Sequence, residues 1–443
     1  MIGGNETKGT VLGGTCVNVG CVPSKNLITV GAVLQQSEGN NPHFESISYG
    51  KTKLDFAKAL SEKDRLVRKF RKEKYQNVLA NLENVEYIPE LARFVSSKEV
   101  RIGKKTITAE KFLIATGARA KPPPVQGLDS VDYLTNEEAL SLKKLPGSMI
   151  VIGGRTLGLE FAQMYAHFGT EVTILQRSDR LLPEDEPEIS DALKFYLEEE
   201  GVEIHTGVGI ERASIAGKMK IIDASINGKK RQFKAEQLLI ATGRKPNTDS
   251  LYAENAGVDI DEEGFVIVND EMRTSAPNIW AAGDVIGEPM LEAIAAKEGA
   301  VAVNNAFGED KRKINFKEVP GAVFTYPEVA RVGYTDQEAN GKGIKCNCCV
   351  LTLEQVPKSH IIGDTRGLIK LVLNRESKKI IGVHILSPHA ADLIHEGVLA
   401  VKFGLTIDDI IDTVHVFPTL SEGIKLAAQS FYRDVSKMSC CTE

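Results

Sequence analysis

The 443-residue sequence has no apolar run that approaches 18 residues, so it predicts no membrane span. Its first residues, MIGGNETKGTVLGGT, lack the apolar core of a secretion signal. The 54 Lys and Arg nearly balance the 60 Asp and Glu, and the net charge of −6 argues against nucleic acid as a partner. Repeats and low-complexity segments are absent, and 42% hydrophobic with 26% charged residues exclude disorder. We therefore expect a cytoplasmic globular chain of roughly three domains.

Cysteine is also scarce, and its positions are informative. The seven cysteines lie at 16, 21, 346, 348, 349, 440 and 441. They are too few and too clustered for a secreted disulfide scaffold, so they predict redox or metal chemistry.

The hydrophobic pattern predicts an α/β protein. Residues 54–82 have helical spacing and dense charge, which indicates a long, largely exposed helix. Short strand-like runs follow over 85–117. Residues 149–175 change to strand, glycine turn, helix and strand, the pattern of a nucleotide-binding unit. Residues 277–307 indicate a strand, an Asp-bearing turn and a helix, and an α+β unit begins near 315.

The strongest motif is GGTCVNVGCVPSK, 13–25. On a regular helix the Cα atoms of Cys16 and Cys21 would lie ~8–9 Å apart, whereas a disulfide needs less than about 7 Å. The pair can bond only where the helix is distorted, and Gly20 and Pro23 flank the second cysteine. A helix start would stabilise a thiolate and make such a disulfide reducible. Taken by spacing alone, the two could equally be unrelated core cysteines.

The second motif, GGRTLGLE, retains Gly153 and Gly158 between a strand and a helix, although Arg155 replaces the middle glycine. The helix N-terminus would hold a pyrophosphate. The next strand ends in Gln176 and Arg177, with Arg180 after a turn, and has no acid for a ribose hydroxyl. Two cations without an acid favour the 2′-phosphate of NADPH, the alternative being two surface arginines without a ligand.

Two further cysteine clusters remain. Cys440 and Cys441 in the tail KMSCCTE suit a soft metal ion on a flexible segment, or are incidental in a frayed terminus. Cys346, Cys348 and Cys349 form CNCC, which we expect in a loop. They indicate an auxiliary metal cluster or, more simply, half-buried thiols, since the spacing does not match zinc.

The 13–25 string resembles the redox-disulfide segment of the flavin-dependent pyridine nucleotide–disulfide oxidoreductases, and the resemblance covers essentially the whole chain. It implies that Cys21 lies against the flavin as the charge-transfer thiolate and that Cys16 is the interchange thiol. It also implies that Lys25 reaches the flavin and pairs with Glu160. The other positions that it implies for FAD are Gly14, Thr15, Ala92, Gly117 and Asp284, and on the NADPH side it adds Gly243.

Within that family, the Cys440–Cys441 tail resembles that of the mercuric reductases. The resemblance implies that this tail collects Hg(II) and passes it to Cys16 and Cys21 of the partner subunit in a homodimer. The disulfide reductases of the family carry HxHPTLSE, whose second histidine protonates the leaving thiolate; here HVFPTLSE places Phe417 at that position, and Glu422 remains. The loss of such an acid–base group typically costs 10²–10⁴-fold in rate, which argues against a disulfide substrate unless His415 substitutes.

The resemblance predicts four segments. They are an FAD-binding part over 1–147, an NADPH-binding domain over 148–270, a second FAD-binding part over 271–314 and a dimerisation domain over 315–443. A family member should begin with its own strand–GxGxxG–helix unit for the ADP half of FAD, but Cys16 follows Met1 too closely for one. We expect a miscalled start or a truncation, because the downstream FAD positions are present; the other explanation is a chain that lacks the unit and binds FAD weakly or not at all. The alternatives are a lipoamide- or glutathione-type disulfide reductase and a flavin-free thiol protein that sequesters mercury.

Overall fold

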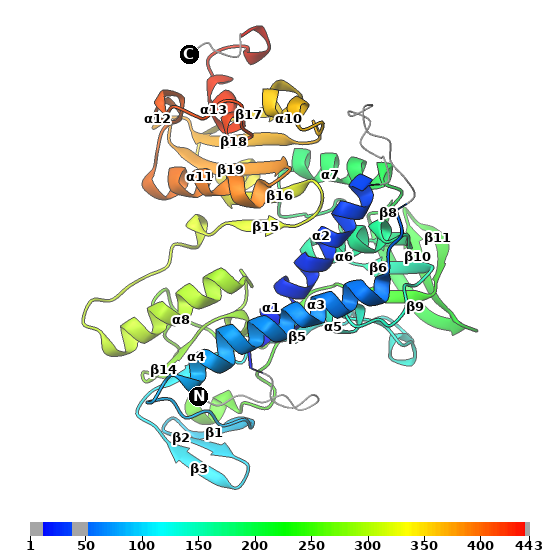
Figure 1. The fold of residues 1–443 in the computed structure, drawn as a ribbon. Coiled ribbons are helices and arrows are strands. Elements are labelled where there is room, and N and C mark those ends of the chain that lie inside the picture. Colours follow the sequence, from blue (N-terminus) through cyan, green and yellow to red (C-terminus); the bar gives the residue numbers. More distant parts are fainter. Residues whose placement is uncertain (1–11, 38–51, 439–443) are drawn as a thin grey trace. The chain divides into compact units, whose positions relative to one another are not determined.

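The computed structural model describes residues 12–37 and 52–438. The chain forms two compact units, each assembled from three segments (Figure 1). The first unit contains residues 1–23, 63–122 and 242–316, and the second contains 24–62, 123–241 and 317–443. Helices and strands occur in both, as the sequence predicts for an α/β protein. The four functional segments expected above remain predictions.

The first unit holds small sheets and the helices around the first cysteine pair. Its helices are α1 (Gly14–Val19), the start of α2 (Cys21–Ser37), most of α3 (Phe56–Arg71), η1 (Lys72–Gln76), α4 (Asn77–Ala80), η3 (Ala253–Ala256), η4 (Asp284–Ile286) and α8 (Glu292–Phe307). An antiparallel sheet consists of β1 (Ala92–Ser96), β2 (Glu99–Ile102) and β3 (Lys105–Thr108). A parallel pair consists of β4 (Phe112–Ile114) and β14 (Ile279–Ala281). An antiparallel pair consists of β5 (Ala118–Ala120) and β13 (Arg244–Pro246). Within the described residues, the parallel sheet of this unit therefore has two strands.

The long helix predicted over residues 54–82 is confirmed. Helical structure runs without a break through α3, η1 and α4, from Phe56 to Ala80. Its middle turn is a π-helix, and most of its side chains are exposed.

The second unit begins with a parallel sheet in the order β12-β6-β7-β8. These strands are β12 (Gln237–Ile240), β6 (Ser148–Ile152), β7 (Glu171–Leu175) and β8 (Glu203–His205), with α6 (Thr156–His167) and α7 (Pro187–Glu199) beside them. The remaining elements of this half are η2 (Leu128–Ser130), α5 (Asn136–Ala139), β9 (Val208–Ala216), β10 (Met219–Ile226) and β11 (Lys229–Ala235). Strand β6 is buried at four successive residues, as expected of a parallel strand covered on both faces.

The other half of the second unit is a five-stranded antiparallel sheet in the order β15-β16-β19-β18-β17 (Figure 1). Its strands are β15 (Gly321–Val323), β16 (Glu328–Gly333), β17 (Cys346–Thr352), β18 (Leu368–Asn374) and β19 (Ile380–Ser387). Its helices are α9 (Asp336–Gly341), α10 (Pro357–Ile361), α11 (Ala390–Phe403), α12 (Ile407–Asp412) and α13 (Glu422–Gln429), with η5 (Phe316–Glu318), η6 (Leu353–Gln355) and η7 (Val435–Lys437). Leu371, Val383 and Val332 share one face of this sheet and pack in one core with residues of α11 and α13.

The loop expected at the CNCC segment is wrong. Cys346, Cys348 and Cys349 lie in β17, the edge strand, and every residue of that strand is paired with β18. The physical reason is the two-residue alternation that follows them: Cys349 and Leu351 face the apolar core, while Cys348 and Val350 face the other side.

One helical stretch, residues 14–37, is long and apolar enough to cross a membrane by length and composition alone. Part of this stretch packs inside the protein, since 33% of it is buried. Leu27 and Leu34 are buried in the main core of the second unit, and Lys25 pairs with a carboxylate of α6. We therefore interpret this stretch as part of the folded domain.

Candidate redox site and nucleotide-binding residues

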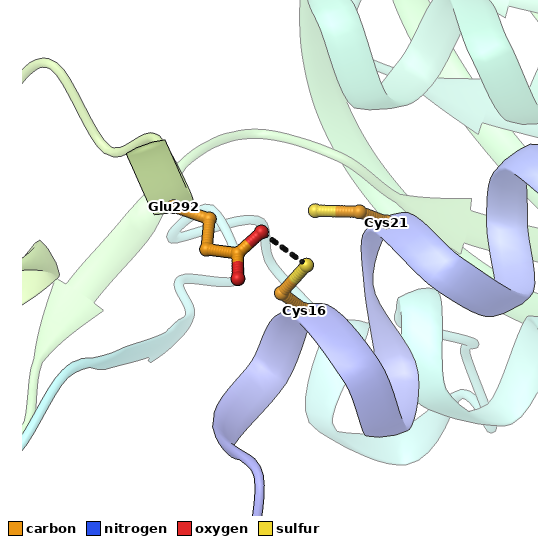
Figure 2. Close-up of side chains that lie close together, drawn as sticks. All are labelled: Cys16, Cys21 and Glu292. Atoms are coloured by element: carbon orange, nitrogen blue, oxygen red, sulfur yellow. Dashed lines mark hydrogen bonds between the residues drawn. The ribbon is translucent and has the colours of Figure 1, made fainter. Parts of the chain in front are cut away.

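The two cysteines of the first motif flank a break between two helices. Cys16 lies on α1, and Cys21 is the first residue of the 17-residue helix α2 (Figure 2). Between them Gly20 leaves the helical conformation, with φ −126° and ψ −120°. A Cβ on Gly20 would lie 2.9 Å from the backbone oxygen of Thr15, so this bend requires glycine. The helix distortion that a Cys16–Cys21 disulfide would require is therefore present.

Glu292, the first residue of α8, completes the cluster of reactive groups. The Sγ atoms of Cys16 and Cys21 and a Glu292 carboxylate oxygen all lie within 4.8 Å of one another. The Cys16 thiol donates a hydrogen bond to Glu292 Oε2 at 3.0 Å (Figure 2). Both cysteines are free thiols, so the structure represents the reduced state of the pair.

This arrangement holds the proton on Cys16. The hydrogen bond with Cys21, burial, and the hydrogen bond to Glu292 together raise the pKa of the Cys16 thiol far above its usual range. Cys21 is the first residue of α2, and the start of a helix favours a thiolate. The Glu292 carboxylate therefore opposes ionisation of Cys16.

Neighbouring side chains hold α1 in place. Asn18 donates to the backbone oxygen of Gly14 at 2.8 Å, and its own side-chain oxygen accepts from Arg71 Nε at 2.8 Å. Tyr75 lies next to Gly13, and burial, followed by the charge of Glu292, raises the pKa of its hydroxyl. Glu292 and Tyr75 were not foreseen from the sequence. An acid at the start of a predicted helix was the one available signal for Glu292.

The predicted Lys25–Glu160 pair is confirmed in the second unit. Lys25 Nζ lies 2.7 Å from Glu160 Oε2, and the glutamate side chain is only 4% exposed. The other Glu160 oxygen accepts the backbone N–H of Phe324 at 3.0 Å, and Lys25 lies over the Phe324 ring. A lysine fixed in this way carries its charge at a defined position.

The glycine turn after β6 has the geometry of a dinucleotide-binding turn. Gly153 has φ +116°, and a Cβ on Gly158 would lie 1.9 Å from the Gly153 backbone oxygen. Only glycine allows this close approach of the turn to the 12-residue helix α6. Buried Gln176, at the end of β7, accepts the Gly154 N–H at 2.9 Å, so it braces the turn where an acid would otherwise hold a ribose.

The two arginines after β7 differ in their surroundings. Arg180 donates to the backbone oxygens of Pro183 and Asp185 at 2.7 and 3.1 Å. Arg177 is exposed and makes no hydrogen bond or ion pair with any residue that the structure describes. Of the two cations, Arg177 is thus the one available to a ligand.

The residues expected to contact FAD in the first unit form a consistent set. Asp284 begins η4 and pairs with Arg244 Nε at 3.1 Å, and Gly283 before it has φ +80° and donates its N–H to buried Glu298. Asn247 donates to the backbone oxygen of Thr116, next to Gly117 at φ +70°. Within the described part of the chain, the second Asp284 oxygen accepts no hydrogen bond, which leaves it available to a ligand hydroxyl. These residues fit a flavin nucleotide.

The remaining residues expected to contact FAD, and Gly243, which is expected on the NADPH side, lie at accessible positions of the same unit. Gly14 and Thr15 are exposed at the start of α1, Ala92 begins β1 and is half-buried, and Gly243 has φ +121° with open space at its Cβ position. Their predicted roles remain predictions, as does the placement of Gly243 near NADPH.

The segment around Phe417 has a phenylalanine in place of the family's acid–base histidine. Phe417 is 49% exposed, and Glu422 Oε2 is buried without a hydrogen-bond partner. His415 bonds Glu396 at 2.9 Å and the Thr413 backbone oxygen at 3.0 Å. The tail cysteines Cys440 and Cys441 lie outside the described residues.

Comparison with known proteins identifies the class. Residues 3–299 match the family described as pyridine nucleotide-disulphide oxidoreductase, and residues 319–428 match its dimerisation domain. The chain belongs to this family.

Individual relatives narrow the comparison. The chain is 43% identical over 434 residues to a mercuric reductase of Bacillus cereus, covering 98% of this chain and 68% of the relative. It is also 43% identical to a mercuric reductase of Staphylococcus aureus, covering 98% and 79%. A solved HOCl-induced flavoprotein disulfide reductase, RclA from Escherichia coli, aligns with a TM-score of 0.85 at 30% identity, covering 98% of this chain and 94% of that one. The chain is thus similar to mercuric reductases over nearly its whole length.

Proposed function

We propose that this protein is an NADPH-dependent flavoenzyme that reduces Hg(II) to Hg(0) in the cytoplasm. The observation that carries the proposal is the reduced Cys16–Cys21 pair, with a carboxylate oxygen within 4.8 Å of both sulfur atoms. Two thiols at this separation can bridge one soft cation, since a metal–thiolate bond is about 2.3 Å long. The 43% identity to mercuric reductases over 98% of the chain supports the same substrate.

The chain's own groups divide the work. Cys21 meets the metal ion as a thiolate, and Cys16 follows when its proton passes to Glu292, 3.0 Å away, and on to solvent. Bound FAD would supply the two-electron transfer from the NADPH hydride by which Hg(II) is reduced to Hg(0). Lys25, held by Glu160, contributes a fixed positive charge toward the flavin ring, and Arg177 binds the 2′-phosphate of NADPH. Asp284 accepts a hydroxyl of the flavin nucleotide.

A homodimer completes the site. The dimerisation-domain match over residues 319–428 supports a two-fold assembly. In this arrangement Cys440 and Cys441 of each subunit capture Hg(II) and deliver it to Cys16 and Cys21 of the other. Residues from about 315 onward form the interface.

A disulfide reductase is the second candidate, since RclA bears that description. Phe417 opposes it, because it stands where the family's histidine protonates a leaving thiolate, and Glu422 Oε2 has no hydrogen-bond partner. The third candidate is a flavin-free thiol protein that sequesters mercury. It would lack the visible absorption band of a flavin, which the other two candidates would have.

The visible spectrum of the purified protein separates the three. We expect a flavin band that gains a long-wavelength thiolate charge-transfer shoulder with NADPH, and NADPH oxidation that depends on added Hg(II). Faster turnover of lipoamide or glutathione disulfide than of Hg(II) would establish the disulfide reductase. A colourless protein that binds Hg(II) without oxidising NADPH would establish the sequestering protein.

A further inference from the structure

A second group of thiols lies in the second unit, on the edge strand β17. The Sγ atoms of Cys346 and Cys348 and a carboxylate oxygen of Asp336 all lie within 4.8 Å of one another. Cys346 donates a hydrogen bond to Asp336 Oδ1 at 3.3 Å. All three residues are half-buried, so the group is sheltered but reachable from solvent. None of them has a role in the reaction described above.

The register of β17 aims the two thiols in one direction. Cys346 and Cys348 are two residues apart on a paired strand, so their side chains lie on the same face of the sheet. Cys349 lies on the opposite face, where its thiol donates to the backbone oxygen of Ala427 at 3.0 Å. The CNCC motif therefore places two thiols together on one face of the sheet and the third thiol on the opposite, core-facing side.

Strand geometry keeps this pair from forming a disulfide. Same-face Cβ atoms two residues apart on a strand are separated by about 6–7 Å, whereas a disulfide needs about 3.5–4.5 Å. A metal ion can close the gap, because two bonds of about 2.3 Å reach sulfur atoms up to about 4.6 Å apart.

The charge around the thiols favours a cation. Burial, followed by the charge of Asp336, raises the pKa of Cys348 to about 12. Burial, followed by the hydrogen bond to Asp336, raises the pKa of Cys346. The negative charge of Asp336 disfavours two bare thiolates beside it. The same charge favours a cation that takes the place of the two thiol protons. Asp336 is held in place, since its N–H donates to Glu186 Oε1 at 2.7 Å and its side chain accepts from Asn340 at 2.6 Å.

We propose that Cys346, Cys348 and Asp336 form a separate site for one thiophilic d¹⁰ cation, the class that includes Hg(II). On binding, two S–H bonds break, two metal–sulfur bonds form, and the two protons go to solvent. The Asp336 oxygen supplies a third, weaker bond, and a position stays open for exchange. This site binds the ion without reducing it, so it does not depend on the proposed catalytic function.

The test uses the full-length flavoprotein in which Cys16, Cys21, Cys440 and Cys441 are replaced by serine. This parent is mixed with HgCl₂ and an excess of free cysteine, desalted, and assayed for mercury per chain. We expect one Hg(II) per chain. Adding Cys346→Ser and Cys348→Ser should abolish retention, and adding Cys349→Ser should leave it unchanged. Asp336→Asn should weaken retention about tenfold.

The outcomes are decisive in both directions. Retention by the parent that is lost only with Cys346→Ser and Cys348→Ser supports the site. A parent that retains no mercury, or the same retention after those two substitutions, overturns it. Circular dichroism checks folding, and Asp336→Asn tests the site with all of its thiols intact. In an otherwise unchanged chain, Cys346→Ser with Cys348→Ser should preserve Hg(II)-dependent NADPH oxidation, so failure of this site is distinct from failure of the catalytic proposal.

Discussion

At the scale of single residues, Glu292 helps to hold the proton on Cys16, together with the hydrogen bond with Cys21 and burial. Its oxygen accepts the Cys16 proton, and its charge adds to the hydrogen bond that holds that proton. The reactivity of Cys16 therefore depends on a residue outside its own motif.

Replacing Glu292 should make Cys16 more reactive in the reduced enzyme. Because Glu292 raises the pKa of Cys16, Glu292→Gln should lower that pKa and increase the thiolate fraction at neutral pH. Each unit of pKa changes this fraction tenfold, and we expect alkylation by iodoacetamide to accelerate about threefold to tenfold. Peptide mass spectrometry of Cys16 after timed labelling measures the rate. Glu288→Gln is the matched control, and equal rates for wild type and Glu292→Gln would contradict the assignment.

Arg177 should determine the preference for NADPH. Its guanidinium is exposed and unengaged among the described residues, whereas that of Arg180 donates to two backbone oxygens. We expect Arg177→Ala to raise the KM for NADPH about tenfold and to leave the KM for NADH nearly unchanged, as for loss of one charged hydrogen bond. Steady-state kinetics with both nucleotides test this. Arg180→Ala should lower thermal stability without changing the NADPH-to-NADH ratio; the reverse pattern would assign the 2′-phosphate to Arg180.

At the scale of secondary-structure elements, a buried glutamate ties α7 to α6 and to the loop before β18. Glu200, which follows α7, accepts from Gln163 at 2.7 Å and contacts His167 and Arg366 at 3.0 and 2.9 Å. Burial alone would raise the pKa of Glu200, but the hydrogen bond from His167 and the other partners lower it below its ordinary value.

The lowered pKa predicts a pH-dependent contribution to stability. Glu200→Gln should reduce the free energy of unfolding at pH 7 by about 3 kcal/mol, because buried partners lose their counter-charge. Because the pKa of Glu200 is lower in the folded state, its ionised form stabilises the fold. This stabilisation is complete above the unfolded-state pKa of about 4.3, and it is lost as the pH falls through the folded-state pKa. The difference between wild type and variant should therefore narrow below about pH 4. Urea unfolding at several pH values measures it; exposed Glu199→Gln is the control, and a gap independent of pH would refute the charge-based explanation.

At the scale of the whole molecule, the proposed dimer makes each site depend on two chains. The prediction is tested with two inactive variants, one carrying Cys16→Ser and Cys21→Ser and the other Cys440→Ser and Cys441→Ser. If the tail acts on the partner subunit, co-expression should restore roughly a quarter of the wild-type activity, since half of randomly paired dimers have one complete site. NADPH oxidation at limiting Hg(II) with a competing thiol is the readout. Activity no higher than that of the tail variant alone would assign each tail to its own chain.

The sequence alone determined those parts of this protein that depend on neighbours along the chain. The helix over 54–82, the glycine turn at Gly153 and Gly158, and the distortion between Cys16 and Cys21 follow from spacing and from residues a few positions apart. Local sterics and hydrogen bonding act over such distances, so the pattern suffices. The Lys25–Glu160 pair, 135 residues apart, was foreseen through the family resemblance and not through local physics.

Only the tertiary structure decided which distant groups meet. Glu292 lies 276 residues from Cys16, and nothing in the spacing of either motif joins them. The sequence predicts a loop at the CNCC segment. In the structure, pairing with β18 places two of its thiols on one face of the sheet, beside Asp336. The sequence does not distinguish Arg177 from Arg180. In the structure, Arg180 donates hydrogen bonds to two backbone oxygens after β7, whereas Arg177 is exposed. For Glu292 and the CNCC thiols the deciding contact depends on how separate elements pack, which a one-dimensional pattern does not encode. The Arg180 contacts are local, and they depend on the backbone conformation of the turn after β7.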